Sequence, residues 1–210
     1  VTSMGFYANR ILPRLISAGM KNKAMTKHRP RIPVRASGRV LEVGMGSGLN
    51  IPWYDQKVTH LFGLEPSAVL QAEAAELAAA ASTPFPVEFL TAGAESIPLE
   101  RSSMDCVVST WTLCSIPDLD LALAEIRRVL KPGGQLLFLE HGRAPDAAVA
   151  RWQDRLAPVF RGLAGCNPNR RIDASIEAAG FRFTDIERSY FDGPRFISWH
   201  FVGSATPDRK

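Results

Sequence analysis

The sequence predicts an α/β fold, with a doubly wound, mostly parallel sheet of seven strands that ends in an antiparallel hairpin. Three observations predict it. From residue 39, short apolar runs alternate with longer amphipathic runs, which is typical of parallel strands joined by helices. A glycine-rich turn follows the first apolar run. The last two strand-like runs are separated by Asp192-Gly193-Pro194 alone, which is too short for a crossover and predicts a hairpin.

The individual elements follow from local composition. Apolar and β-branched runs bounded by turn residues predict strands over residues 39–43, 60–65, 87–91, 104–110, 135–140, 181–191 and 195–202. The stretch 66–81 is dense in Ala, Leu and Glu, which favour a helix. Asp118 is a suitable N-cap for a second helix that ends at Leu130. Two more helices are expected, over residues 147–163 and 170–179.

Length and composition indicate one globular domain. The chain has 210 residues, of which 46% are hydrophobic and 22% are charged, as in ordinary globular proteins. We expect an N-terminal basic segment over residues 1–36, the main domain over residues 37–203 and a flexible tail over residues 204–210. No apolar run approaches the roughly 18 residues of a membrane span, and no signal peptide is recognisable. We therefore expect a cytoplasmic protein.

The cysteines and histidines predict neither a disulfide framework nor a metal site. The three cysteines are an odd number at unrelated spacings, which favours a reducing compartment. The histidines lie too far apart in the sequence to show metal-ligand spacing, at positions 28, 60, 141 and 200.

Three glycines at every second position follow the first predicted strand: Gly44, Gly46 and Gly48. Such a turn normally faces a ligand at the carboxyl edge of the sheet, because glycine permits positive φ and close backbone approach. Glu65 lies 17 residues beyond Gly48, at the end of the second strand, where an acidic side chain can accept both hydroxyls of a ribose. The pattern therefore predicts a nucleoside-containing cofactor, whereas the alternative is a tight turn without a ligand.

The spacing of these glycines disfavours a dinucleotide. A dinucleotide site wants G-x-G-x-x-G, whereas this turn reads G-x-G-x-G. The chain also offers no second domain to hold a hydride acceptor. A nicotinamide-linked oxidoreductase is therefore a distant alternative.

Five stretches, in family order, resemble the motifs of class I S-adenosylmethionine-dependent methyltransferases. They are E-V-G-M-G-S-G-L-N at 42–50, Glu65-Pro66-Ser67, Ala92-Gly93-Ala94-Glu95 before Ile97-Pro98-Leu99, Met104–Ser109 with Thr110-Trp111, and Arg127–Gly134. The resemblance implies a Rossmann-like sheet, S-adenosylmethionine as cofactor and S-adenosylhomocysteine as product. It implies that the cofactor is bound by Glu42, Gly44, Gly46, Gly48, Asn50, Glu65, Pro66, Ser67, Ala94, Glu95, Thr110 and Trp111. The alternative for Glu95 is a solvated loop carboxylate.

A narrower resemblance concerns the acceptor. Thr112–Ser115, Leu139–His141 and Gly165–Asn167 are similar to segments of the thiol S-methyltransferases of animals, which are membrane-anchored. Their bacterial relatives are grouped with phospholipid N-methyltransferases and quinone-biosynthesis C-methyltransferases. We expect no such anchor here. The resemblance implies methylation of a small, apolar thiol, and headgroup N-methylation, quinone-type C-methylation and a non-catalytic cofactor-binding role stay open.

Methyl transfer from a sulfonium is an in-line displacement, so positioning and exclusion of water can supply most of the acceleration. His141 ends the fifth predicted strand and is the candidate base, because an imidazole of pKa near ~6.5 can take a proton from a thiol of pKa near ~8.5. The alternative is a structural histidine bonded to a loop carbonyl.

Free cysteines are usually core residues. The resemblance nevertheless implies an acceptor pocket lined by Phe6, Tyr7, Cys114, His141, Cys166 and Asn167.

The N-terminal segment carries the basic excess. Residues 1–41 hold nine Lys and Arg and no Asp or Glu, whereas the remainder holds 16 basic and 21 acidic residues. Residues 6–20 read as an amphipathic helix. In the family that the motifs resemble, a leading helix folds over the cofactor as a lid. Two alternatives are transient contact with an anionic membrane and a packed helix with a solvated basic face. Nucleic acid is not an expected partner, because the main domain is net acidic.

Overall fold

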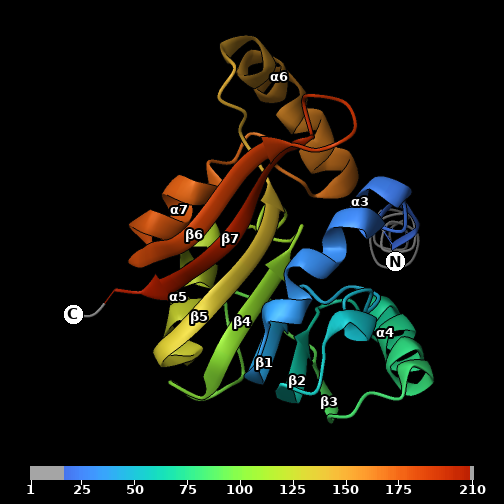
Figure 1. Cartoon of the computed structure of the whole chain (residues 1–210). Coiled ribbons are helices and arrows are strands. Elements are labelled where there is room, and N and C mark those ends of the chain that lie inside the picture. Colours follow the sequence, from blue (N-terminus) through green and yellow to red (C-terminus); the bar gives the residue numbers. More distant parts are fainter. Residues whose placement is uncertain (1–16, 209–210) are drawn as a thin grey trace, which may run out of the picture.

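The computed structural model describes residues 17–208, and it contains a seven-stranded sheet in the order β3-β2-β1-β4-β5-β7-β6 (Figure 1). β1 to β5 pair in parallel, and β7 pairs antiparallel with β5 and β6. The predicted seven strands and C-terminal hairpin are confirmed. The strands are β1 (Gly38–Val43), β2 (Val58–Leu64), β3 (Val87–Leu90), β4 (Met104–Thr110), β5 (Leu130–His141), β6 (Phe181–Tyr190) and β7 (Trp199–Pro207).

Helices cover both faces of this sheet. The Asp118 side chain accepts a hydrogen bond from the Leu121 N–H and caps α5, as predicted. The Ser67 hydroxyl caps α4 by accepting from the Leu70 N–H. The helices are α3 (Lys23–His28), α4 (Ala68–Ala81), α5 (Leu119–Val129), α6 (Ala147–Ala164) and α7 (Ile172–Ala178), with 3-10 turns η2 (Arg29–Arg31), η3 (Pro33–Arg35) and η4 (Ile51–Trp53).

Alternate residues of each central strand enter two separate cores, because successive side chains of a strand point to opposite faces. Leu41, Val107 and Phe138 pack with α5 and α7. Val40 and Val108 pack on the other face, with the N-terminal segment, η4 and α4. The central strands are thus buried on both sides, which explains their nearly continuous apolar sequences.

The glycine turn leads into the single 3-10 turn η4, which contains Pro52. The structure corrects two expectations about the end of the chain. β7 begins four residues later than predicted and continues to Pro207. Residues 204–207 are therefore part of the sheet and not of a flexible tail, because they pair with β6 and Ser204 and Ala205 are buried.

Three basic residues of the N-terminal segment pair with acidic groups on β6 or just after it. Arg31 bonds to Glu187 and Arg35 bonds to Asp185, at N···O distances of 2.5 and 2.6 Å, and Lys27 lies 3.6 Å from the carboxylate of Asp192. The predicted helix over residues 6–20 lies largely outside the described residues, as do Phe6 and Tyr7. No helix within residues 17–208 is long and apolar enough to cross a membrane.

Candidate active site

A cavity of about 290 Å³ opens at the carboxyl ends of β1, β2 and β4. Eight of the twelve predicted cofactor-binding residues line it: Gly44, Gly46, Glu65, Pro66, Ala94, Glu95, Thr110 and Trp111. The other four, Glu42, Gly48, Asn50 and Ser67, do not line it. Ser17, Met20 and Arg29 also line the cavity, and sequence analysis had not singled them out.

The three glycines of the turn serve different purposes. All three have positive φ, between 58° and 79°. A Cβ on Gly44 would lie 2.3 Å from the Thr112 side chain, and one on Gly48 would lie 3.0 Å from the Cα of Ala74. A Cβ on Gly46 would meet no described atom within 4 Å. Packing therefore requires glycine at 44 and 48, whereas Gly46 leaves open space at the cavity wall.

Glu65 fixes the glycine turn through its carboxylate. One oxygen accepts a hydrogen bond from the Gly46 N–H at 3.0 Å, and the other accepts from the Ser67 N–H at 2.9 Å. Burial raises the pKa of Glu65, and these two N–H groups oppose the shift. Each oxygen retains a further acceptor site, so this carboxylate can bind two ligand hydroxyls without releasing the turn.

Glu42 and Asn50 belong to a buried polar network behind the cavity wall. The Asn50 amide donates to Glu42 at 2.7 Å and to the Thr110 hydroxyl at 2.9 Å, and the Tyr54 hydroxyl donates to the second Glu42 oxygen. The Arg29 guanidinium donates to the Asn50 carbonyl at 3.0 Å. Burial raises the pKa of Glu42 to about 7. The network connects β1 to the N-terminal segment.

Trp111 stands at the end of β4 in a strained conformation. Its φ is 53°, a left-handed value that costs a bulky residue roughly 1–3 kcal/mol. Its N–H donates to the Leu139 carbonyl, its indole N–H donates to His200 Nε2 at 3.0 Å, and the Arg29 guanidinium lies 4.9 Å from the ring centre. These contacts hold the indole against the cavity.

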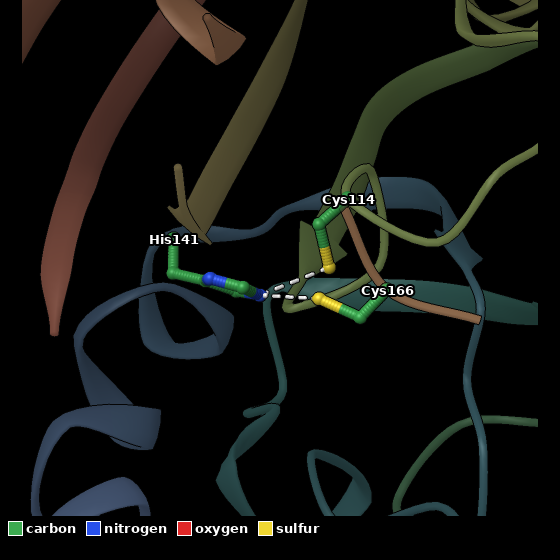
Figure 2. A group of neighbouring side chains, drawn as sticks. All are labelled: Cys114, His141 and Cys166. Atoms are coloured by element: carbon green, nitrogen blue, oxygen red, sulfur yellow. Dashed lines mark hydrogen bonds between the residues drawn. The ribbon is translucent and has the colours of Figure 1, made fainter. Parts of the chain in front are cut away.

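Cys114, His141 and Cys166 meet beside the cavity without lining it (Figure 2). His141 Nε2 lies 3.1 Å from Cys114 Sγ and 3.2 Å from Cys166 Sγ. Hydrogen bonding from Cys166 lowers the pKa of the Cys114 thiol well below its usual value, whereas the same contact raises the pKa of Cys166. Burial opposes protonation of His141, but the neighbouring Cys114 raises its pKa overall. We call these three residues the sulfur–imidazole cluster.

The loops that carry this cluster are held by buried hydrogen bonds. Glu140 accepts from the Ser109 hydroxyl and from the N–H groups of Thr112 and Leu113. The backbone and side-chain N–H groups of Asn167 both donate to the Cys114 carbonyl, at 2.9 and 3.2 Å. The loop after β4 is thereby joined to the end of β5 and to the loop after α6.

Comparisons with known proteins agree with this geometry. A methyltransferase-domain family model matches residues 41–138. The thiol S-methyltransferase TMT1B of Rattus norvegicus is 35% identical over 175 residues, which cover 79% of this chain and 69% of the rat protein. The chain belongs to the class I S-adenosylmethionine-dependent methyltransferases.

Two further similarities bear on this methyltransferase. The C-methyltransferase UbiE of Hahella chejuensis, named for ubiquinone/menaquinone biosynthesis, is 41% identical over 68 residues, 32% of this chain and 27% of that protein. A crystal structure of a SAM-dependent methyltransferase from Thermotoga maritima has a TM-score of 0.67 at 19% identity, covering 94% of this chain and 99% of that one. The second similarity shows the fold alone.

The cavity of the methyltransferase fits S-adenosylmethionine in its donor set. Gly46 leaves room for close approach, Glu65 offers spare acceptor sites beside it, and Arg29 brings a buried positive charge to the wall. Sequence analysis missed Arg29 because no local pattern distinguishes it from the other basic residues of the N-terminal segment.

Proposed function

We propose that this enzyme methylates the sulfur of a small, apolar thiol. The observation that carries the proposal is the extent of the similarities. The family model ends at residue 138, and the UbiE match spans 68 residues. The match to the rat thiol S-methyltransferase spans 175 residues, too many to fit within residues 41–138. It therefore extends beyond the cofactor motifs, into parts of the chain that help to select an acceptor.

The cavity residues take specific roles in this proposal. Glu65 accepts the ribose hydroxyls, Gly44 and Gly46 lie along the methionine moiety, Ala94 and Glu95 border the adenine, and Arg29 binds the methionine carboxylate. When bound, S-adenosylmethionine would supply an electrophilic methyl carbon with a neutral thioether as leaving group, for attack by the acceptor sulfur after it has lost its proton. The protein then has to position the two sulfurs and exclude water.

The surroundings of the cavity support an apolar, sulfur-containing acceptor. Met20, Trp111, Ile116 and Pro117 contribute apolar wall. Cys114 precedes Ser115, which lines both the cavity and a neighbouring hollow. Asn167 lines that hollow and touches Cys114. An acceptor that enters through the hollow would pass Ser115 and Asn167, which adjoin Cys114.

The N-terminal segment covers the cavity in this proposal and acts as its lid. The Ser17 hydroxyl donates to the Glu73 carboxylate on α4 and shares a hydrogen bond with the Ser47 hydroxyl, at 2.9 Å each. Arg29 Nη2 donates to the Met20 carbonyl at 3.2 Å. These contacts support a covering role for the described part of this segment, residues 17–36.

A single assay tests the acceptor class. Release of S-adenosylhomocysteine is measured with small alkyl and aryl thiols, sulfide, phosphatidylethanolamine in liposomes and a quinol precursor, using wild type and Glu65→Ala. We expect turnover with thiols and its loss in Glu65→Ala. Turnover with the lipid alone would identify headgroup N-methylation, and turnover with the quinol alone would identify C-methylation. Tight cofactor binding without turnover on any acceptor would indicate a binding protein.

A further inference from the structure

The sulfur–imidazole cluster places three soft ligand atoms around one point, although they come from three different loops. Cys114 follows β4, His141 ends β5 and Cys166 follows α6. Their Sγ, Nε2 and Sγ atoms all lie within 4.8 Å of one another, and the three side chains converge (Figure 2). We propose that Cys114, His141 and Cys166 bind a zinc ion and that its fourth coordination position receives the acceptor thiol. The second half of this inference rests on the proposed thiol methylation.

The distances suit zinc after a small expansion. Zinc binds thiolate sulfur at about 2.3 Å and imidazole nitrogen at about 2.0–2.1 Å in tetrahedral geometry, which separates nitrogen from sulfur by about 3.5 Å. His141 Nε2 lies 3.1 and 3.2 Å from the two sulfurs. If each distance between the nitrogen and a sulfur lengthens by about 0.4 Å, the cluster has the dimensions of a zinc site. Thiolate and imidazole ligands favour zinc over magnesium and calcium, which prefer oxygen.

The ligand atoms are held in place before any metal arrives. Glu140 anchors the backbone just before Cys114, and Asn167 joins the loops of the two cysteines. Within the described residues His141 Nδ1 has no hydrogen-bond partner, so the ring's polar contacts are those of Nε2 with the two sulfurs. Preorganised ligands reduce the entropy lost on binding.

Three protein ligands are the pattern of a zinc ion that binds a substrate, because structural zinc sites usually have four. Cys166 is partly exposed, and its neighbours Gly165 and Asn167 line the hollow that adjoins the cavity. A thiol entering from this hollow can reach the fourth position.

The protons balance at each step. Zinc binding displaces two protons from the cluster to solvent, and the two cysteine thiolates that remain neutralise its charge. A thiol that coordinates zinc is deprotonated outright, so its proton also goes to solvent and the bound sulfur keeps its lone pairs for the methyl carbon. His141 acts here as a ligand and not as a base.

The first test measures zinc in the full chain, reduced and kept without oxygen. Protein that has been stripped of metal and dialysed against zinc is analysed by mass spectrometry of the element. We expect about one zinc per chain for wild type and about two protons released per zinc. Cys114→Ser and Cys166→Ser should lose the metal. Cys106→Ala, which removes the third cysteine, buried within β4, should retain it.

Control measurements separate loss of the site from loss of the fold. Each variant is checked for binding of S-adenosylhomocysteine, which the cavity and not the cluster determines. Zinc should raise the melting temperature of wild type but not of Cys166→Ser. If reduced wild type retains no more zinc than Cys114→Ser and Cys166→Ser, the site does not exist.

Activity assays then separate the two proposals. Zinc bound at one per chain without thiol turnover would leave the metal site standing and overturn the thiol acceptor. Thiol methylation at the full rate by zinc-free protein would overturn the placement of the acceptor on zinc. Loss of both zinc and thiol turnover in Cys166→Ser, with cofactor affinity unchanged, is the result expected if both proposals hold.

Discussion

The carboxyl edge of the sheet has two halves that are built in opposite ways. The cofactor half is made mainly by short segments at the ends of β1 to β4, so most of its groups stand in local motifs, with Arg29 as an exception. The acceptor half is made by Cys114, His141 and Cys166, which are 25 to 52 residues apart along the chain. The first half is fixed by backbone conformation, and the second by contacts between distant loops. Residues of the two halves should therefore respond differently to substitution.

The largest effect is expected for Glu65→Ala. This change removes the acceptor for the Gly46 and Ser67 N–H groups and the proposed contacts to the ribose. Charge-assisted hydrogen bonds contribute about 1.5–3 kcal/mol each, so S-adenosylhomocysteine should bind about 1000-fold more weakly by calorimetry. Glu88→Ala, at an exposed position of β3, is the matched control. Equal affinities in the two variants would contradict the role of Glu65, and zinc content should change in neither.

The next largest effect concerns the glycine turn. Gly44→Ala places a methyl group against Thr112 and should lower the free energy of unfolding by about 3–4 kcal/mol, from overpacking and positive φ together. Gly46→Ala should lower it by about 1–2 kcal/mol and weaken cofactor binding instead. Urea unfolding measures the first change and calorimetry the second. The double variant Gly44→Ala/Thr112→Ala should recover part of the stability; no recovery would show that the clash is not the cause.

The smallest effect is a pH dependence at Glu42. Burial raises its pKa to about 7, so the folded protein holds a proton that the unfolded chain releases between pH about 4.5 and 7. The stability that Glu42 contributes is complete below this window and is lost as the pH rises through it. The free energy of unfolding of Glu42→Gln, relative to that of wild type, should therefore rise by about 3 kcal/mol as the pH increases across this window. Unfolding curves across the window test this, with Glu88→Gln as control. If the free energies of unfolding of wild type and Glu42→Gln changed with pH in the same way, the raised pKa of Glu42 would be excluded.

Most of the fold could be predicted because its signals are local. Asp118 caps α5 as expected, and β4 has the predicted ends. β7 was misplaced because Arg195–Ile197 alternate like a strand, whereas the Ile197 N–H bonds back to the Pro194 carbonyl in a turn. The small residues after Val202 look like a tail in the sequence, but burial between β5 and β6 keeps them in the sheet.

The site was predictable only where local motifs form it. Gly46 and Glu65 line the cavity as expected, because a turn after a parallel strand must face the sheet edge. The meeting of Cys114 with His141 and Cys166 could not be derived from their spacing, since strand order brings them together. The expectation that no metal site exists was based on that spacing, and the cluster shows why spacing alone cannot decide it.

Arg29 has a consequence for the speed of the catalytic cycle. Its guanidinium bonds at once to Met20 on the covering segment and to Asn50 behind the cavity wall. Lifting the segment to free the product must pull the desolvated Arg29 cation away from Asn50, whereas Met20 moves with it on the same segment, and closing must bury the cation again. We therefore expect the residence time of the product, and not bond formation, to limit turnover, as it does in many enzymes with lids. An initial burst of methylated acceptor followed by a slower steady rate would be its kinetic signature.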